Sequence, residues 1–193
     1  MNKSIAFLKE TFRNFRDTGS FARSSPALCR EMVRHIDFRT AHTIVELGPG
    51  DGVITEYILR EMRPDAILLT FEVSDGFCKI LRERFDDPRL HIIHDSAEHL
   101  HHHLYERQLK QVDAVISAIP FLNLPESLMQ RIIHQCLAHL RIGARFVQFH
   151  YSPHPVSRYR NIFGNARMHF IPINFPPAFV IVCDKIGSSK TKI

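Results

Sequence analysis

A glycine-rich turn in the first third of the chain has the composition of a nucleotide site. The apolar segment 43–47 is followed by Gly48, Gly50 and Gly52, and a helical apolar pattern begins directly afterwards at residue 53. Glycine permits close approach of the backbone to a ligand, and a helix start offers free N–H groups to a negative group. Strand, glycine turn and helix in this order are typical of a nucleotide-binding α/β unit. A glycine turn without a ligand is the alternative interpretation.

The spacing of the glycines indicates which kind of nucleotide site to expect. A dinucleotide site requires Gly-x-Gly-x-x-Gly, and the position of the third glycine is occupied by Val53. The chain instead reads Glu46-x-Gly48-x-Gly50-x-Gly52, with the acid at the end of the expected strand. This pattern resembles the first motif of class I S-adenosylmethionine-dependent methyltransferases. The resemblance implies S-adenosylmethionine as the cofactor and S-adenosylhomocysteine (SAH) as its product.

Two further acids follow expected strands. The apolar segment 66–72 predicts a buried second strand that ends in Glu72. A carboxylate at this position can accept hydrogen bonds from both ribose hydroxyls of a nucleotide. Asp95 closes the third strand, where it or its neighbour Ser96 can meet the adenine edge. An N-cap for the next helix is the alternative role of Asp95.

The segments after the fourth and fifth strands are expected to hold the methyl acceptor. The fourth strand, 112–117, ends in Ser117 and runs into an apolar loop stiffened by two prolines. Loops beyond the carboxyl ends of strands border the ligand crevice of an α/β sheet. We therefore expect Ser117 at the cofactor and Pro120 and Phe121 against the acceptor. The fifth strand delivers polar and aromatic residues into a further loop, namely His150, Tyr151, His154, Arg158, Tyr159, Arg160 and Arg167.

Periodicity predicts an α/β fold. Strands are expected at 43–47, 66–72, 91–94, 112–117, 144–150, 168–173 and 178–183, and helices at 2–16, 26–35, 75–85 and 126–140, the last ended by Gly143. These elements fit a Rossmann-like class I methyltransferase fold. Its sheet would be seven-stranded and mostly parallel, with an antiparallel C-terminal hairpin and flanking helices.

Length and composition fit one domain. The 193 residues, 45% of them hydrophobic, can form a sizeable core, so we expect 1–193 to be a single domain with an N-terminal helical segment at 1–35. No apolar run reaches the length of about 18 residues typical of a spanning helix. Charged residues also interrupt the N-terminal apolar pattern, which argues against a secretory signal.

Charge and cysteine usage restrict the partners. The net charge of +5 and a pI near 9.2 indicate an anionic partner, either nucleic acid or a membrane surface. The four cysteines have no paired spacing, which indicates reduced cytosolic thiols rather than disulfides or a zinc site. Consecutive residues on a helix point in different directions, so the run 101–103 of three histidines is not expected to bind a metal.

Residues 2–16 predict an amphipathic helix. Its apolar stripe is Ile5, Leu8, Phe12 and Phe15, and its basic flank is Lys9, Arg13 and Arg16. Such a helix can lie in the headgroup region of an anionic membrane. Packing of the stripe on the domain is the alternative.

Five blocks of sequence make a family resemblance specific. They are Phe21–Pro26, Val45–Gly50, Ser117–Pro125, Val147–Pro153 and Asn174–Ala178. Together they resemble the bacterial phospholipid N-methyltransferase family, in this order and over nearly the whole chain. Asp51 and Ala118 depart from the threonine and glycine usual in that family. The resemblance implies a peripheral enzyme on the cytoplasmic face of the membrane that methylates phosphatidylethanolamine, in steps towards phosphatidylcholine.

The resemblance also suggests roles for the residues after the fifth strand. An amine must lose a proton before each methyl transfer, and His150 is the expected acceptor or relay, since histidine titrates near neutral pH. A histidine bonded within the strand end is the alternative. Tyr151 and Tyr159 can hold the amine, by cation–π attraction once it is methylated. Arg158 or Arg160 can bind the lipid phosphate.

Two other functions are open. Ribosomal RNA adenine dimethyltransferases are similar in sequence, but they need Asn or Asp at the start of the fourth-strand motif, where this chain has Ser117 and Ala118. They also usually carry a C-terminal helical domain, for which this chain is too short. A non-catalytic membrane- or RNA-binding module is the second alternative, and the intact acids and glycine turn disfavour it.

Overall fold

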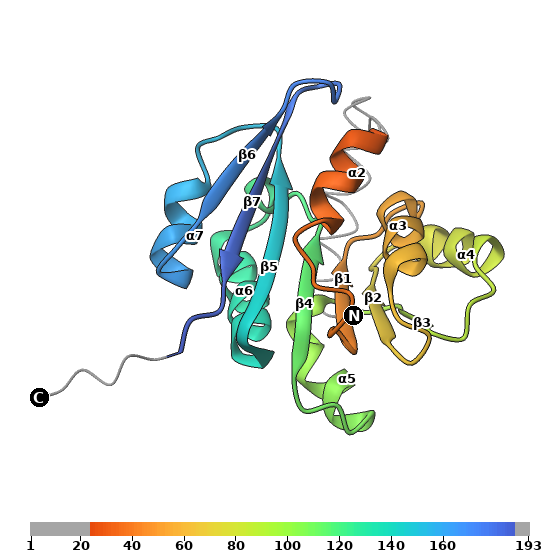
Figure 1. Cartoon of the computed structure of the whole chain (residues 1–193). Helices are drawn as coiled ribbons and strands as arrows, with labels where there is room; N and C mark the ends of the chain where they lie inside the picture. The colour runs from red at the N-terminus through yellow and green to blue at the C-terminus, as the bar shows by residue number, and fades with distance from the viewer. Residues whose placement is uncertain (1–23, 188–193) are drawn as a thin grey trace, which may run out of the picture.

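The computed structural model of this protein describes residues 24–187, through which a single sheet runs (Figure 1). The strands are β1 (Thr43–Leu47), β2 (Ile67–Phe71), β3 (Leu90–Ile93), β4 (Val112–Ser117), β5 (Leu140–His150), β6 (Arg167–Ile171) and β7 (Ala178–Asp184). They lie in the order β3-β2-β1-β4-β5-β7-β6. The strands from β3 to β5 are parallel, and β7 is antiparallel to both of its neighbours. This confirms the expected Rossmann-like sheet and C-terminal hairpin. The expected helix 2–16 lies outside the described residues.

Helices cover both faces of the sheet. They are α2 (Pro26–Val33), α3 (Val53–Glu61), α4 (Asp75–Arg84), α5 (Leu100–Glu106), α6 (Glu126–His139) and α7 (Val156–Phe163), with short 3-10 turns η1 (Ala97–His99) and η2 (Phe121–Asn123). Successive residues of a strand point to opposite faces. In β1, Ile44 packs in the cluster formed with α2 and α3, whereas Val45 packs in the cluster formed with α5, α6 and α7. Burial on both faces explains why the strands read as continuous apolar runs.

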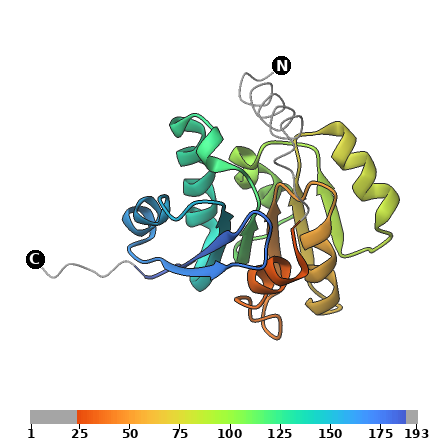
Figure 2. The ribbon, with the colours of Figure 1, turned by 90° about the horizontal axis from the view of Figure 1, so that it is seen from above.

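The strand order reverses between β1 and β4. Strands β2 and β3 lie on one side of β1, and β4 and β5 lie on the other side. Ligands of open α/β sheets bind outside the carboxyl ends of the strands at such a reversal. The topology therefore places the expected site at the carboxyl edge between β1 and β4, and Figure 2 views the molecule from above this edge.

Helix α2 begins as predicted. Ser25 is its N-cap and accepts a hydrogen bond at Oγ from the N–H of Leu28 (3.2 Å), and Pro26 follows in the first turn. Three basic side chains then surround the Glu31 carboxylate, namely Arg34 (3.0 Å), His35 (3.0 Å) and His169 of β6 (3.5 Å). This network holds α2 against the edge strand of the sheet.

Two local expectations were wrong. Helix α6 ends at His139, and Gly143 lies inside β5. The pairing register between β5 and β4 shifts at this point. Gly143 has a φ of 82°, and its N–H donates to the carbonyl of Lys185 (2.8 Å). The glycine therefore supplies the backbone conformation of a strand irregularity. In addition, the segment after β5 contains helix α7. Arg158, Tyr159 and Arg160 therefore lie on a helix and not in a loop.

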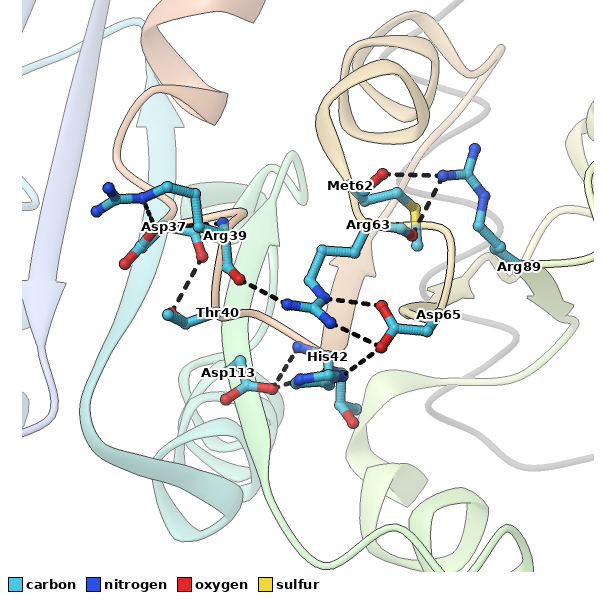
Figure 3. A network of polar contacts seen from close by, with 10 residues as sticks. Asp37, Arg39, Thr40, His42, Met62, Arg63, Asp65, Arg89 and Asp113 are labelled. Atoms are coloured by element: carbon cyan, nitrogen blue, oxygen red, sulfur yellow. Dashed lines mark hydrogen bonds and ion pairs between the residues drawn. The ribbon is translucent and has the colours of Figure 1, made fainter.

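The amino edge of the sheet is tied by ion pairs and backbone contacts (Figure 3). Asp113 accepts the N–H groups of His42 (2.8 Å) and Thr43 (2.9 Å) with one carboxylate oxygen. The guanidinium of Arg63 donates to the carboxylate of Asp65 (2.7 and 2.8 Å) and to the carbonyl of Arg39 (2.8 Å). These contacts join the segments that enter the first, second and fourth strands.

Candidate active site

The glycine turn between β1 and α3 adopts a conformation that only glycine adopts easily. Gly48, Gly50 and Gly52 have φ values of 68°, 58° and 83°. A Cβ at Gly48 would lie 3.1 Å from Cγ1 of Ile119, so this glycine lets the loop after β4 approach the turn. A Cβ at Gly52 would lie 2.5 Å from the Phe85 ring. Gly52 thus serves the packing of the turn against α4 and the residues that follow it.

Glu72 lies at the carboxyl end of β2, buried at 1% exposure. Its two oxygens accept hydrogen bonds from the N–H of Ser74 (2.8 Å) and of Gly50 (3.3 Å). The second bond ties the acid directly to the glycine turn, which joins two separately predicted parts of the site. Burial raises the pKa of the Glu72 carboxyl to about 7, although the backbone N–H bonds lower it. Further donors, such as ribose hydroxyls, would stabilise its ionised form.

A narrow cavity connects the predicted cofactor residues. It is lined by Gly48, Phe71, Glu72, Val73, Asp95, Ala97, Ile119 and Ile132. The carboxylates of Glu72 and Asp95 lie on its wall beside apolar side chains. Carboxylates can accept hydrogen bonds from hydroxyls, and apolar side chains can pack against a flat ring. The groups on this wall are compatible with an adenosine group; that Glu72 binds the ribose and Asp95 the base stays a prediction. Gly48, Glu72 and Asp95 meet here although they are far apart in the sequence.

Asp95 is fixed by its neighbours. One oxygen accepts from the N–H of Ser96 (2.7 Å) and from Nδ1 of His99 (2.9 Å), and the other contacts Nε2 of His103 (2.9 Å). Partial burial acts to raise the pKa of Asp95, but these hydrogen bonds outweigh it and the pKa lies below its ordinary value. Ser96, and not Asp95, is the N-cap of the following 3-10 turn.

The three consecutive histidines diverge. His103 contacts Asp95, His102 pairs with Glu106 (3.1 Å), and His101 lies 3.3 Å from a ring nitrogen of His139. His103 also lies 3.8 Å from Glu106, so His102 and His103 share that carboxylate while His101 turns towards α6.

Glu46 lies beneath the glycine turn and not on the cavity wall. Its Oε2 accepts hydrogen bonds from the hydroxyls of Thr55 on α3 (2.7 Å) and Thr70 on β2 (3.3 Å). Its Oε1 is buried and has no hydrogen-bond partner among residues 24–187. Burial raises the pKa of Glu46 to about 7, against the effect of the two threonines, and the nearby charge of Glu72 raises it further. Direct cofactor binding by Glu46 stays a prediction.

A second pocket adjoins the first. It has a volume of about 210 Å³ and is lined by Ala118, Ile119, Pro120, Leu122, Asn123, Phe149, His150, Tyr151 and Ser152. Ile119 lines both pockets, so the predicted cofactor cavity and the expected acceptor pocket are neighbours. The structure thus brings Pro120, His150 and Tyr151 together as predicted. No Asp, Glu, Lys or Arg lines this pocket within the described part of the chain.

Some predicted residues lie behind the pockets. Phe121 is buried in the core at 1% exposure, and Ser117 is buried with its Oγ 3.4 Å from the N–H of Ile119. Sequence reasoning missed Gln148, whose amide donates to the carbonyl of Ile119 (3.1 Å) and holds the loop after β4. It also missed Asn123 in the pocket wall. Both residues stand in the blocks that carried the family resemblance, and this was the available signal.

His150 and Tyr159 form a buried pair. Nε2 of His150 lies 2.9 Å from the hydroxyl of Tyr159, which is 1% exposed and sits behind the histidine. Burial lowers the pKa of His150 to about 4, so its imidazole is neutral at pH 7. Burial also raises the pKa of Tyr159 well above its ordinary value. The pair presents a neutral, fixed imidazole to the pocket.

The two predicted phosphate ligands lie on α7, and neither lines the pocket within residues 24–187. Arg158 contacts Glu126 (3.8 Å) and the sulfur of Met129 (3.4 Å), both on α6. Arg160 is exposed. Arg167, grouped with them in the sequence, pairs instead with Asp184. Phosphate binding by Arg158 or Arg160 stays a prediction.

The fold and this arrangement of cavities define a class I S-adenosylmethionine-dependent methyltransferase. An O-methyltransferase from Bacillus cereus, solved in complex with SAH, has the same fold with a TM-score of 0.68, 14% identity, and coverage of 93% of this chain and 91% of that chain. An rRNA methylase from Streptococcus thermophilus gives a TM-score of 0.59 at 16% identity over 82% of this chain and 94% of that chain.

The sequence comparisons are more specific. Residues 13–171 match the family described as ribosomal RNA adenine dimethylase. Over 98% of this chain and the whole of the relative, the sequence is 32% identical to an ornithine lipid N-methyltransferase of Singulisphaera acidiphila. The chain therefore belongs to the ribosomal RNA adenine dimethylase family of methyltransferases, within which its relatives include a lipid N-methyltransferase. Among the described residues, no helix combines the length and hydropathy needed to cross a membrane.

Proposed function

We propose that this protein transfers the methyl group of S-adenosylmethionine to the amine of a phospholipid headgroup, with phosphatidylethanolamine and its methylated forms as acceptors. The observation that carries this proposal is the acceptor pocket, which is uncharged and partly aromatic. Phe149 and Tyr151 meet in it edge to face, with ring centroids 5.5 Å apart. Aromatic faces attract an ammonium group, and the charge becomes permanent once three methyl groups leave the nitrogen with no proton to lose. The lipid N-methyltransferase relative supports the same acceptor chemistry.

The neutral His150 gives the pocket an orienting group. With a pKa of about 4, the imidazole is too weak a base to keep a proton at pH 7. When its Nε2–H donates to the Tyr159 oxygen, Nδ1 is left as an acceptor for an amine N–H. This changes the expected role from proton acceptor or relay to alignment, in which His150 holds the amine while the displaced proton leaves to solvent. S-Adenosylmethionine, when bound, supplies the electrophilic methyl group.

The test is lipid-product analysis. The full chain is incubated with labelled S-adenosylmethionine and vesicles that contain phosphatidylethanolamine, and the extracted lipids are analysed by mass spectrometry. We expect mono-, di- or trimethylated headgroups. A parallel arm offers an ornithine lipid, because the relative's name makes its amine the competing lipid acceptor. Methylation of the ornithine lipid alone would exclude the phospholipid while keeping the lipid amine.

Ribosomal RNA adenine dimethylation is the second candidate. The family match over residues 13–171 favours it, as does Asn123, whose side-chain carbonyl in the pocket wall offers an acceptor for an adenine amine. The strand end itself carries Ser117 and Ala118 instead of the Asn or Asp expected there. Incubation with ribosomal RNA and labelled cofactor, followed by nucleoside analysis, tests it. Dimethyladenosine without any methylated lipid would overturn the lipid proposal.

We also propose that residues 2–16 dock the protein on the cytoplasmic face of an anionic membrane. This segment lies outside the described residues, and the proposal rests on its sequence pattern and on the net charge of +5. Each basic residue near an anionic surface contributes about 1 kcal/mol, so neutralising Lys9, Arg13 and Arg16 should weaken vesicle binding by about a hundredfold at low salt. Co-sedimentation with anionic and neutral vesicles measures this. Unchanged binding would leave the stripe with a packing role.

A further inference from the structure

The turn between β6 and β7 exposes large apolar side chains. Phe175 is 86% exposed and Ile173 is 74% exposed. On β6 directly before the turn, Phe170 and Met168 are also exposed. Residues 172–177 are called the hairpin tip below. Single exposed apolar residues are common, but two such side chains on one protrusion indicate a contact with an apolar phase.

The hairpin tip is held in a fixed conformation by Asn174. This side chain is buried between the two exposed ones. Its Oδ1 accepts the N–H of Ser25 at the start of α2 (3.0 Å), and its Nδ2 donates to the carbonyl of Pro176 (2.6 Å). The backbone N–H of Asn174 bonds to the carbonyl of Ile171 (3.4 Å). An inward asparagine of this kind keeps Ile173 and Phe175 outside the fold.

The hairpin tip lies beyond the acceptor end of the sheet. His150, the last residue of β5, is in register with Phe179 on β7, and Phe179 is in register with Phe170 on β6. The residues between Phe170 and Phe179 therefore extend past the level of His150. Figure 1 shows the turn between β6 and β7 at the top of the molecule, beyond the end of β5. The apolar protrusion and the acceptor pocket thus belong to the same end of the sheet.

The composition of the hairpin suits the interface of a lipid bilayer. No Asp, Glu, Lys or Arg occurs from Met168 to Cys183. Backbone N–H groups without a partner are costly in an apolar phase. Pro172, Pro176 and Pro177 have no N–H, and that of Asn174 is already bonded. Four of the six residues of the tip therefore have no unbonded backbone N–H to be desolvated when the tip leaves water.

We propose that Ile173 and Phe175 insert into the headgroup–acyl boundary of a bilayer and set the acceptor pocket at the depth of the lipid amine; this rests on the proposed lipid acceptor. A protein partner fits less well, because the two side chains offer far less than the roughly 800 Å² per partner that a stable protein interface buries. A bilayer requires no matching surface, and burial of apolar area is sufficient. The hairpin tip is a second docking element, separate from residues 2–16.

A single-tryptophan reporter tests the insertion directly, because the chain contains no tryptophan. Phe175→Trp places the reporter at the hairpin tip. Tyr105→Trp places it at an equally exposed position (77%) on α5, away from the tip. Vesicles of phosphatidylcholine and phosphatidylglycerol, which contain no amine acceptor, are added to each full-length variant. We expect a blue shift of the emission for Phe175→Trp alone. The absence of a shift at the tip, or an equal shift in both variants, overturns the proposal.

A second pair of variants measures the contribution to binding. The tip variant, which combines Ile173→Asp with Phe175→Asp, should bind the same vesicles at least tenfold more weakly. The control variant, which combines Ile142→Asp with Tyr105→Asp, should change binding less than twofold, since Ile142 is also exposed (69%) but lies near the start of β5. Unchanged SAH affinity confirms that each variant is folded. Equal binding of both variants overturns the proposal.

The same variants separate this proposal from the proposed function. If the tip controls vesicle binding but no lipid is methylated, the insertion stands and the lipid acceptor fails. If the tip variant methylates lipids at an undiminished rate, the acceptor stands and the insertion fails.

Discussion

Asp113 at the amino edge of the sheet differs from Glu46 and Glu72 at the carboxyl edge in how fully its carboxylate is satisfied, whereas Asp95 at the carboxyl edge is satisfied as fully as Asp113. At the amino edge, Asp113 is saturated by two backbone N–H groups and by Arg141, and these contacts outweigh burial and lower the pKa of the carboxyl. At the carboxyl edge, Glu46 and Glu72 are more deeply buried and have fewer donors, and burial raises the pKa of both to about 7. Saturated acids hold a fold together. Glu72 lies on the cavity wall and can accept further donors from a ligand, whereas Glu46 lies beneath the glycine turn; perturbed pKa values often cluster at functional sites.

The largest effect is expected for Glu72, the acid on the cavity wall, and is measured as a loss of SAH affinity. If Glu72 accepts two hydrogen bonds from the ribose as predicted, each of about 1.5–3 kcal/mol to a charged group, Glu72→Ala should lower SAH affinity by a hundredfold or more. Asp65→Ala, at the amino edge, is the matched control and should leave affinity unchanged. Calorimetric titration measures both. Wild-type affinity in folded Glu72→Ala would remove Glu72 from the cofactor site.

The pH dependence of stability should have opposite signs for Glu46 and for Asp113. For Glu46, the folded pKa of about 7 exceeds the ordinary value of 4.5, so the folded state binds more protons and the free energy of unfolding falls as pH rises from about 4.5 to 7. The difference corresponds to about 3 kcal/mol once the group is fully ionised. For Asp113, the folded-state pKa lies below the ordinary value, so the ionised carboxylate contributes stability at pH values above the ordinary pKa. This contribution is lost as the pH falls through the folded-state pKa.

Urea unfolding between pH 5 and 8 measures the Glu46 side of this contrast. Glu46→Gln keeps an acceptor for the hydroxyls of Thr55 and Thr70 but cannot ionise, so it should make the decline less steep, the remainder coming from Glu72, and be more stable than the wild type at pH 8. An unchanged slope in this variant would show that Glu46 does not titrate in that range.

A smaller effect is expected at the saturated edge. Asp113→Ala leaves the N–H groups of His42 and Thr43 and the guanidinium of Arg141 without their acceptor. The free energy of unfolding should fall by about 2 kcal/mol, given a net value near 1 kcal/mol for each hydrogen bond and partial access to water. SAH affinity of the folded fraction should stay the same. A large loss of affinity would contradict the separation of the two edges.

The smallest effect is expected at the buried pair behind the acceptor pocket. Tyr159→Phe removes the partner that fixes the His150 tautomer, and turnover on lipid should fall by about tenfold with little change in SAH affinity. His150→Gln keeps a side-chain acceptor and should retain more activity than His150→Ala. Because the pKa of His150 is about 4, turnover should show no inflection from this group between pH 6 and 8. Loss of cofactor binding in these variants would give the pair a structural role.

The sequence by itself determined the order and type of most elements. Apolar runs and the glycine turn are local signals, and each element that they predicted within residues 24–187 is present there. The C-terminal hairpin followed from its two apolar segments and the intervening prolines. Local signals failed at Gly143 and at α7, because a strand irregularity depends on its neighbouring strand and because the short α7 follows a proline-rich segment that resembles a loop.

Only the tertiary structure decided which groups meet. The bond from Gly50 to Glu72, the position of Ile119 between two cavities and the burial of Tyr159 behind His150 join residues from different elements. Sequence spacing placed Glu46 and Glu72 alike at strand ends. Burial and partner geometry put one beneath the turn and the other on the cavity wall, because the direction of a side chain and the donors around it are set by packing between strands and helices.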